Sequence, residues 1–480
     1  MNYRMITYLL GIILLIEAAL LIFPIIVAIC FGESILPFLI TMAIITLVSV
    51  VPVIFKPKNT LIYAKEGFVT VAITWLLMSA LGALPFVFSG AIPNYVDAFF
   101  ETVSGFTTTG ATIMTSIEGS GYAILFWRSF THWIGGMGVL VFMLAILPSA
   151  GGQAIHLMRA EVPGPTKEKL VPKMKNTAVI LYGIYVVLTL LMTISLLFCG
   201  LSFYDSVVNA LATAGTGGFS VLNDSIAGYN NPAAEWVIAI FMFIFGVNFN
   251  LYFYIIVGKI AYVFKNEEFK VYTAICVIST ALITANAFKF FDGFGDALRG
   301  AFFQVMTIMS TAGYATANFD LWPEFSKTLL VLLMFVGACA GSTAGGLKVS
   351  RIIILFKHAA CEIKHMMRPG SVNVVRLDKE AVDRSTVQKA TTHLTIYFLI
   401  MTLSVFLISV DGFSFTTNTT AVISCINNIG PGLEVVGPIG NFAEYSAFSK
   451  IVLSLVMLIG RLEIMPMMIL FASFFSKKRR

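Results

Sequence analysis

The chain has 480 residues, of which 58% are hydrophobic and only 12% are charged. An average soluble domain has about 25% charged residues, so the composition excludes a soluble protein of several domains, whose surfaces need more charge than this chain has. The formal net charge is +6, but the basic residues gather at the ends of apolar runs, as they do in cytoplasmic loops. We therefore predict an all-α polytopic membrane protein without a nucleic-acid partner.

Ten apolar stretches are long enough to cross a bilayer, whose hydrocarbon core of about 30 Å needs about 20 helical residues. The first is too long for the apolar part of a signal peptide, so we expect it to stay as a span. Four further stretches look helical but are too short to cross, near residues 95–107, 203–213, 296–311 and 415–428. The predicted spans lie near residues 5–30, 36–55, 68–90, 122–148, 177–200, 235–262, 271–288, 326–356, 391–410 and 449–475.

The distribution of charge predicts the orientation of these spans. With ten spans, 25 of the 31 Lys and Arg residues fall on the side that carries the N-terminus. The positive-inside rule makes that side cytoplasmic and places both termini there. Acids gather on the opposite side, where a ring of carboxylates would concentrate cations, although outer loops can also simply lack basic residues. These acids are Asp97, Glu101, Asp205, Asp224, Glu235, Asp296, Asp320, Glu324, Glu434 and Glu444.

The chain also contains an internal repeat, which is informative about architecture. After two extra N-terminal transmembrane helices in residues 1–60, four units follow, each reading span, short helix, glycine-containing loop and span. We expect these units in residues 61–158, 159–265, 266–365 and 366–480. The loop triplets that align are Thr108-Thr109-Gly110, Thr213-Ala214-Gly215, Thr311-Ala312-Gly313 and Asn428-Ile429-Gly430.

This repeat predicts a cation pore. Non-helical backbone at membrane depth is tolerated where it is buried in protein or lines a water-filled cavity, and four such loops fit a ring around one axis. The carbonyl end of each short helix favours a cation, glycine allows carbonyl oxygens to face the axis, and rings of carbonyls can replace the water shell of potassium. The loops lack the T-V-G-Y-G pattern of tetrameric potassium channels, so we expect weaker discrimination between potassium and sodium.

Two features below the proposed filter suggest a gate. The small residues from Gly337 to Gly346 make poor helix, so the span is expected to break there and send a loop into the pore; tight helix packing is the alternative. Arg461 lies near mid-membrane and should face the bundle interior or a water-filled cavity. There it would oppose cation flow, or it would form a structural ion pair with Glu463 or Glu434. The predicted gate residues are Gly341, Ser342, Thr343, Gly345, Gly346 and Arg461.

Several of these stretches resemble one known family. Residues 104–112 and 128–138 are similar to the first filter, and the signature after it, in the Trk/Ktr/HKT superfamily of potassium transporters. Residues 427–432 and 460–463 resemble the fourth repeat of the same family. The resemblance covers nearly the whole chain, and the two extra spans and the length favour the bacterial Trk membrane subunit over the Ktr branch.

The resemblance implies four covalently joined pore units around one pore, homodimers in the bacterial inner membrane, and potassium as the permeating ion. It implies that residues 341–346 form an intramembrane gating loop above a cytosolic nucleotide-binding subunit of the TrkA type, for which residues 348–389 offer a docking surface. The chain has neither G-x-x-x-x-G-K nor a G-x-G-x-x-G motif beside a strand, so adenine nucleotide is expected only on that partner. No cofactor is expected in this chain.

Other functions are less favoured by the residues. A secondary transporter that couples potassium to protons or sodium would also use broken helices, but it typically has inverted repeats, whereas these four units share one sense. His358, Cys361 and His365 share a helix face, yet three ligands in a basic loop are a weak metal site. His132 is expected to be a packed, hydrogen-bonded histidine, and nothing at membrane depth suggests an enzyme.

Overall fold

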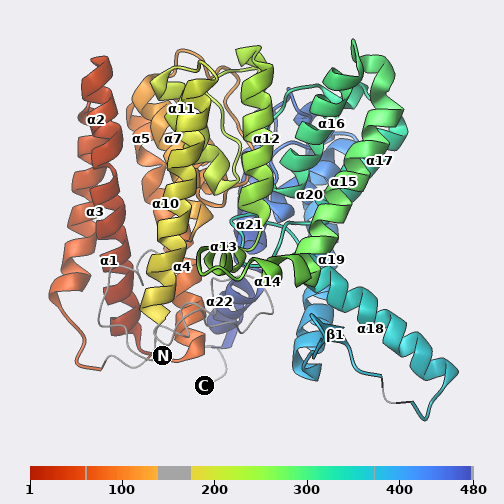
Figure 1. Cartoon of the computed structure of the whole chain (residues 1–480). Coiled ribbons are helices and arrows are strands. Elements are labelled where there is room, and N and C mark those ends of the chain that lie inside the picture. The colour runs from red at the N-terminus through yellow and green to blue at the C-terminus, as the bar shows by residue number, and fades with distance from the viewer. Residues whose placement is uncertain (60–61, 139–173, 372, 477–480) are drawn as a thin grey trace.

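The computed structural model describes residues 1–59, 62–138, 174–371 and 373–476. Within these ranges the chain is a bundle of helices with one antiparallel hairpin, in which β1 (Arg376–Leu377) pairs with β2 (Glu380–Ala381). Figure 1 shows the N-terminal helices along one edge of the bundle, and α18 (Val349–Met367) extending away from its lower end. The hairpin lies beside that helix.

The N-terminal helices pack against the first of the predicted units. They are α1 (Tyr3–Leu20), which continues as α2 (Ile22–Phe31), then α3 (Leu36–Ile54). The side chain of Asn2 accepts a hydrogen bond from Met5 N and so caps α1. The next helices are α4 (Ala64–Gly82), α5 (Leu84–Phe88), α6 (Tyr95–Phe106) and α7 (Tyr122–Gly136).

The four short stretches are helices, as predicted. They are α6, α11 (Phe203–Gly215), α16 (Phe294–Met309) and α20 (Phe415–Asn427). Asn94, Ser202 and Ser414 precede three of them, and each side chain accepts a hydrogen bond from a backbone N–H of the first turn. Such capping stabilises a helix start by about 1 kcal/mol, which helps short helices to form in place.

The long helices agree only partly with the ten predicted spans. By length and composition, six segments of the described ranges can cross a membrane, or up to eight if two bent pairs each count as one span. The predicted span 122–148 runs out of the described residues after residue 138. The six segments are Tyr3–Phe31, Leu36–Ile54, Lys65–Phe88, Thr177–Phe198, Glu267–Phe290 and Arg384–Asp411.

Three predicted spans are not continuous helices. α12 (Pro232–Gly246) meets α13 (Phe249–Ile256) at 92°, because Val247 is extended between them. α21 (Ala447–Arg461) meets α22 (Met465–Ser476) at 117°, where Glu463 and Ile464 have positive φ. α17 (Glu324–Met334) and α18 are separated by non-helical residues 335–348. The predicted spans 235–262 and 449–475 are therefore bent pairs of helices, whose bends the sequence did not predict, while the break expected in 326–356 is confirmed.

The remaining elements complete the bundle. The other α-helices are α10 (Met174–Phe198), α14 (Ile260–Lys265), α15 (Glu267–Ala287) and α19 (Arg384–Ile408). Short 3₁₀ turns, mostly after the short helices, are η2 (Ser225–Tyr229), η3 (Phe288–Phe290), η4 (Phe319–Leu321), η5 (Ser409–Asp411) and η6 (Glu434–Val436).

Polarity is distributed as in a membrane protein. Large apolar side chains such as Leu47, Leu190 and Phe406 are exposed on the outside of the bundle. Hydroxyl and amide side chains such as Thr108 and Asn428 are completely buried at its centre. An apolar exterior with a polar centre suits a bundle that is solvated by lipid and surrounds a polar pathway.

Candidate functional site

The four short helices end in the same backbone turn. The first residue of each turn has a left-handed φ between 55° and 58°, and the residue two places later is a glycine with φ between 76° and 105°. The N–H between them returns to the carbonyl five residues earlier at 2.8–3.0 Å, from residue 109 to 104, 217 to 212, 312 to 307 and 429 to 424. The four triplets are Thr108-Thr109-Gly110, Thr216-Gly217-Gly218, Thr311-Ala312-Gly313 and Asn428-Ile429-Gly430.

This geometry corrects the predicted loop of the second unit by three residues. Thr213, Ala214 and Gly215 form the last turn of α11, not the loop that follows it. Gly215 packs against α7, because a Cβ placed on it would lie 2.2 Å from the carbonyl oxygen of His132. The sequence contains a spacing that could have placed the second loop correctly. Gly110, Gly218 and Gly430 each lie 16 residues after the Asn or Ser that caps the preceding short helix.

Neighbouring turns contact one another in a closed cycle. A Cβ added to Gly110 would lie 2.0 Å from the carbonyl oxygen of Gly217, and one added to Gly218 would lie 1.8 Å from that of Ala312. A Cβ on Gly313 would lie 2.0 Å from the oxygen of Ile429. The cycle closes because a Cβ on Gly430 would lie 2.8 Å from the oxygen of Thr109. Each glycine therefore lies against a carbonyl oxygen of the next turn, where a side chain would not fit. The first turn contacts the second, the second the third, the third the fourth, and the fourth the first.

Side chains of the turns add polar atoms to this layer. The hydroxyl of Thr108 is buried and has no hydrogen-bond partner among the described residues. Asn428 Nδ2 donates to Thr109 Oγ1 at 3.0 Å, which links the fourth turn to the first. Ala312 and Ile429 are fully buried. The second residue of each triplet thus varies, while the backbone of all four turns stays the same.

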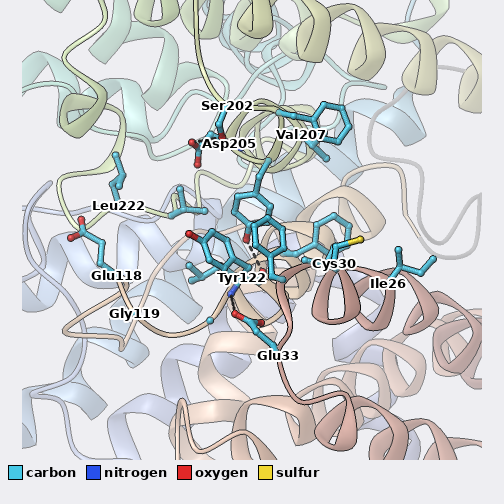
Figure 2. A pocket seen from close by; sticks show the side chains of 18 residues that line it. Ile26, Cys30, Glu33, Glu118, Gly119, Tyr122, Ser202, Asp205, Val207 and Leu222 are labelled. Carbon is cyan, nitrogen blue, oxygen red and sulfur yellow. Dashed lines mark hydrogen bonds between the residues drawn. The ribbon is translucent and has the colours of Figure 1, made fainter.

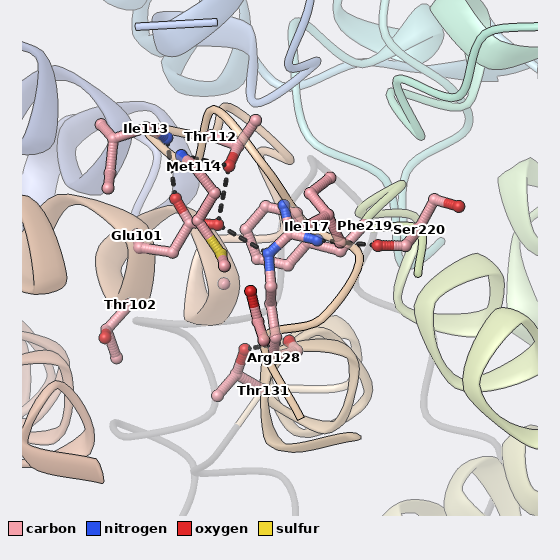
Figure 3. A network of polar contacts seen from close by, with 12 residues as sticks. Glu101, Thr102, Thr112, Ile113, Met114, Ile117, Arg128, Thr131, Phe219 and Ser220 are labelled. Carbon is pink, nitrogen blue, oxygen red and sulfur yellow. Dashed lines mark hydrogen bonds and ion pairs between the residues drawn. The ribbon is translucent and has the colours of Figure 1, made fainter. Parts of the chain in front are cut away.

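A buried ion pair supports the first and second turns. Arg128 Nε donates to Glu101 Oε1 at 2.6 Å, and Arg128 Nη1 donates to the carbonyl of Ser220 at 2.9 Å (Figure 3). Glu101 Oε2 also accepts from Ile113 N at 2.9 Å. Figure 3 shows the carboxylate between the chain leaving the first turn and the guanidinium that reaches toward the second. The ion pair therefore fixes the direction in which the chain continues after the first and second turns.

His132, one turn further along α7 than Arg128, supports the same two turns. Its Nδ1 donates to the carbonyl of Gly105 at 2.8 Å, and its Nε2 accepts from Phe219 N at 3.3 Å. These partners set the tautomer, because one ring nitrogen must carry the proton and the other must accept. The prediction of a packed, hydrogen-bonded histidine is confirmed.

Several of the acids predicted for the outer side are paired with basic residues in the structure. Glu101 is buried with Arg128, Asp97 binds Lys450 at 2.7 Å, and both Glu235 and Asp296 bind Arg299. That these acids concentrate cations stays a prediction, to which the paired carboxylates would contribute less than the unpaired ones.

Two more of these carboxyls lie just beyond the third and fourth turns. Asp320 Oδ2 accepts from Glu434 N at 2.9 Å, and burial raises the pKa of Asp320. Hydrogen bonds from Ser414 and Thr417 lower the pKa of Glu434. These contacts join the segments that leave two neighbouring turns.

Residues 335–348 form a folded loop directly beneath the turns. Gly345 N donates to Thr311 Oγ1 at 2.8 Å, so the loop binds the first residue of the third turn. A Cβ on Gly345 would lie 2.6 Å from the carbonyl oxygen of Asn427, next to the fourth turn. Gly341 and Gly346 have positive φ, which glycine adopts without strain. The loop thus lies against the underside of two of the four turns.

The same loop fills the break between α12 and α13. Cys339 N donates to the carbonyl of Gly246, and Phe249 N donates to that of Gly341, both at 3.0 Å. Thr343 Oγ1 donates to the carbonyl of Phe245 at 3.3 Å. Ser342 Oγ turns back to the carbonyl of Cys339 at 2.6 Å. Each backbone break thereby supplies polar partners to the other, as buried irregular backbone requires.

Arg461 joins this loop to the first unit. Its Nη1 donates to the carbonyl of Thr343 at 2.9 Å, and its Nη2 donates to the carbonyls of Gly135 and Gly136 at 2.6 and 2.9 Å. Of the two carboxylates considered for a structural ion pair with Arg461, Glu463 binds Arg351 at 2.9 Å, and Glu434 accepts hydrogen bonds from Ser414 and Thr417. Arg461 is thus positioned by backbone carbonyls at the end of α7 and in the loop.

Two charged residues hold the loop in a way that the sequence did not indicate, and one of them, Lys348, was wrongly expected on a docking surface, since it is buried. Glu268 is buried, and its Oε1 accepts from Ala340 N at 2.7 Å and from Ser350 N at 2.9 Å. The Nζ of buried Lys348 donates to the carbonyls of Ala344 and Gly345. Glu268 lies in the first turn of α15, where an acid usually indicates only favourable helix-end electrostatics. No local pattern in the sequence therefore indicates this contact.

Comparisons with known proteins agree with this arrangement. Residues 37–478 match the sequence model of the family described as "TrkH: Cation transport protein". The chain is 34% identical to the Trk system potassium uptake protein TrkH of Salmonella typhimurium, over 100% of both chains. It is 29% identical to the Trk system potassium uptake protein TrkG of Escherichia coli, over 99% of each.

The fold is similar to a solved structure of the same kind. The crystal structure of the potassium transporter TrkH from Vibrio parahaemolyticus matches with a TM-score of 0.88 and 29% identity, covering 99% of this chain and 100% of that one. Both the family match and the full-length relatives extend across the four turns and the loop beneath them. The chain therefore belongs to the TrkH family of cation transport proteins.

Proposed function

We propose that this chain takes up potassium through a single pore whose selectivity filter is the ring of four turns. The observation that carries the proposal is the closed cycle in which each glycine gives room to a carbonyl of the next turn. Such a ring offers carbonyl oxygens from four backbones with matched geometry, and these can replace the hydration shell of potassium. The names of the relatives, which are potassium uptake proteins, favour potassium as the permeating ion.

The filter residues of this proposal are Thr108, Thr109 and Gly110 in the first turn, Thr311, Ala312 and Gly313 in the third, and Asn428, Ile429 and Gly430 in the fourth. For the second turn we propose Thr216, Gly217 and Gly218 in place of the triplet that ends at Gly215. The unpartnered hydroxyl of Thr108 supports a site where an ion or water completes its hydrogen bonding. Because the four triplets differ in sequence, we expect lower selectivity for potassium over sodium than in symmetric potassium channels.

The loop from Gly341 to Gly346 is proposed to be the gate. Its position against Thr311 and Asn427 supports a plug beneath the filter. The guanidinium of Arg461 adds a positive charge, which opposes the passage of a cation at low dielectric. Opening requires the loop to leave these contacts, and the carbonyls that bind Arg461 give it a defined closed position.

Regulation is proposed to come from a cytosolic nucleotide-binding partner of the TrkA type. The segment that follows the gate is α18, which extends from the bundle and carries basic residues such as Lys357 and Lys364 (Figure 1). A partner that moves α18 would pull directly on the gating loop, since the two are continuous. We propose that the subunit works as a homodimer in the bacterial inner membrane, with both termini cytoplasmic and four repeats following two extra N-terminal helices.

Growth of a bacterium that lacks potassium uptake tests the function. Expression of this chain together with its partner is expected to restore growth at low potassium, and ⁸⁶Rb⁺ uptake should rise in parallel. Failure of both, with the protein present in the membrane, would contradict the proposal.

The second candidate is a transporter that couples potassium to protons or sodium. The buried carboxylate of Glu268 is the observation that favours this second candidate, because coupling needs a titratable group near the pathway. Vesicles with equal potassium on both sides distinguish the two. A coupled carrier moves ⁸⁶Rb⁺ against its gradient when a proton or sodium gradient is imposed, whereas a channel does not.

A further inference from the structure

A cleft of about 1120 Å³ lies on the outside of the bundle, away from the filter. Its walls come from the end of α2, the start of α7 and the start of α11 (Figure 2). These are the ends of the helices opposite the N-terminus, since α1 and α2 together make one span that ends at Phe31. The cleft therefore lies near the membrane surface opposite the N-terminus.

The depth of the cleft corresponds to the boundary between lipid headgroups and acyl chains. Ile26 lies five residues before the end of α2, and Phe126 lies four residues after the start of α7. At 1.5 Å per residue, the cleft reaches about 6–8 Å into the bundle from the helix ends. Amphipathic groups bury to about 5–10 Å at this boundary. The wall of the cleft that lies farther from the helix ends is apolar, with Val27, Leu125 and Val207 among its residues.

Three aromatic rings form the floor between the walls. Phe31 stacks on Tyr122 with centroids 4.1 Å apart, and Tyr204 meets Tyr122 edge-on at 5.0 Å. The hydroxyl of Tyr204 donates to the carbonyl of Tyr122 at 2.6 Å, which fixes the arrangement. Aromatic faces attract a cation, most strongly where water is excluded.

The charge of the cleft is negative. Its 18 lining residues include Glu33, Glu118 and Asp205 and no Lys, Arg or His. Glu33 accepts from Tyr122 N and Ala123 N and so caps α7, while Asp205 accepts from Ser202 Oγ at the start of α11. Two helix starts contribute roughly +0.5 each, so the three carboxylates leave a balance of about −2. An anionic headgroup is therefore repelled and a cationic one attracted.

We propose that this cleft binds one phospholipid whose headgroup ends in an ammonium group. The ammonium lies at the carboxylate end near the aromatic rings, and an acyl chain follows the apolar wall between α2, α7 and α11. The membrane is the source of such a ligand, because the cleft opens where lipid meets the protein. The site is independent of the pore, so the proposal stands or fails without the proposed transport function.

Native mass spectrometry of the purified full-length protein tests the proposal. The protein is equilibrated with an equal mixture of phosphatidylethanolamine, which carries an ammonium, and phosphatidylglycerol, which is anionic. The wild-type chain should retain one phosphatidylethanolamine in preference to phosphatidylglycerol. The double variant Glu118→Gln and Asp205→Asn should reduce this preference about fivefold, the effect of removing two partly exposed charge contacts.

A filled cleft gives the second arm of the test. Cys30 lines the cleft and is exposed, so Cys30→Trp should displace the lipid without disturbing a core. Val187→Trp, on the exposed face of α10, is the matched control and should keep it. Equal retention of both lipids by the wild type, an unchanged preference in the double variant, or detergent alone in the cleft would each overturn the proposal. Loss of dimer mass with Cys30→Trp would also overturn it, because the occupant would then be a second copy of this chain.

Discussion

The layer of turns and the layer directly beneath it are built in opposite ways. The four turns share one backbone geometry, although their sequences differ. Below them, each broken span differs: α12 and α13 meet at 92°, α21 and α22 at 117°, and α17 and α18 are separated by a long loop. A symmetric backbone suits the binding of a spherical ion, whereas an asymmetric layer suits the gate that we propose for one loop and one arginine. Selectivity and gating can therefore be disturbed separately.

The largest effect is expected from a side chain placed inside the ring. Gly313→Ala should reduce ⁸⁶Rb⁺ uptake at least about tenfold, because its Cβ would meet the carbonyl oxygen of Ile429. Gly412→Ala is the matched control, since Gly412 has nearly the same positive φ but open space around it. In both variants the alanine must adopt a left-handed backbone conformation, which lowers the free energy of unfolding by about 1–2 kcal/mol. Equal uptake by the two variants would contradict a ring that depends on close contact.

The register of the second turn can be tested in the same layer. Gly218→Ala should lower the selectivity for potassium over sodium, because its Cβ would displace the carbonyl of Ala312. Gly215→Ala should instead lower the amount of folded protein, since its Cβ would meet the carbonyl of His132 in α7. Reversal potentials, measured on the folded protein that each variant yields, distinguish a change of selectivity from a loss of folded protein. A change of selectivity with Gly215→Ala alone would restore the register first predicted from the sequence.

The gating layer should respond in the opposite direction. Arg461→Ala removes a positive charge and three hydrogen bonds to carbonyls, so uptake without the regulatory partner should rise about fivefold or more. Shortening the loop between Gly341 and Gly346 should have the same effect. Ion selectivity should stay as in the wild type, because the four turns are intact. Unchanged partner-free uptake in both variants would count against a gate at this position.

A smaller rise is expected from Glu268→Ala. Loss of this carboxylate leaves Ala340 N and Ser350 N buried without an acceptor, at about 1–3 kcal/mol each. Glu267→Ala is the control, because the neighbouring carboxylate binds Lys357 at the surface. Partner-free uptake should increase in the first variant only. If both behave alike, Glu268 does not position the loop.

The smallest effect concerns acid stability at the outer end of the fourth turn. Hydrogen bonds from Ser414 and Thr417 lower the pKa of Glu434, so its contribution to stability is complete above the unfolded pKa of about 4.3. It is lost as the pH falls through the lower folded pKa. The melting temperatures of wild type and Glu434→Gln should therefore differ by a constant amount from pH 8 to 6 and converge in acid. A difference that instead grows in acid would contradict this sign.

The sequence predicted the symmetric layer better than the asymmetric one. Apolar length identified six of the predicted spans as single long helices, and repeated glycines identified three of the four turns. The second turn was misplaced because Thr213-Ala214-Gly215 resembles Thr311-Ala312-Gly313, whereas α11 continues through Gly215 and the left-handed turn begins at Thr216. Composition likewise does not report a bend, so the breaks after Gly246 and Arg461 were missed. Contacts between distant segments, such as Glu268 with the loop, depend on packing that no local pattern records.

The most direct test of the central claim is the reversal potential of the purified protein in planar bilayers, measured under a potassium gradient for wild type and Gly313→Ala. A single pore with the four turns as its filter predicts that the wild type reverses close to the potassium equilibrium potential. It also predicts that Gly313→Ala moves the reversal potential toward that of a non-selective pore. A reversal potential that follows a proton gradient at equal potassium and equal sodium, or one that Gly313→Ala leaves unchanged, would contradict the account.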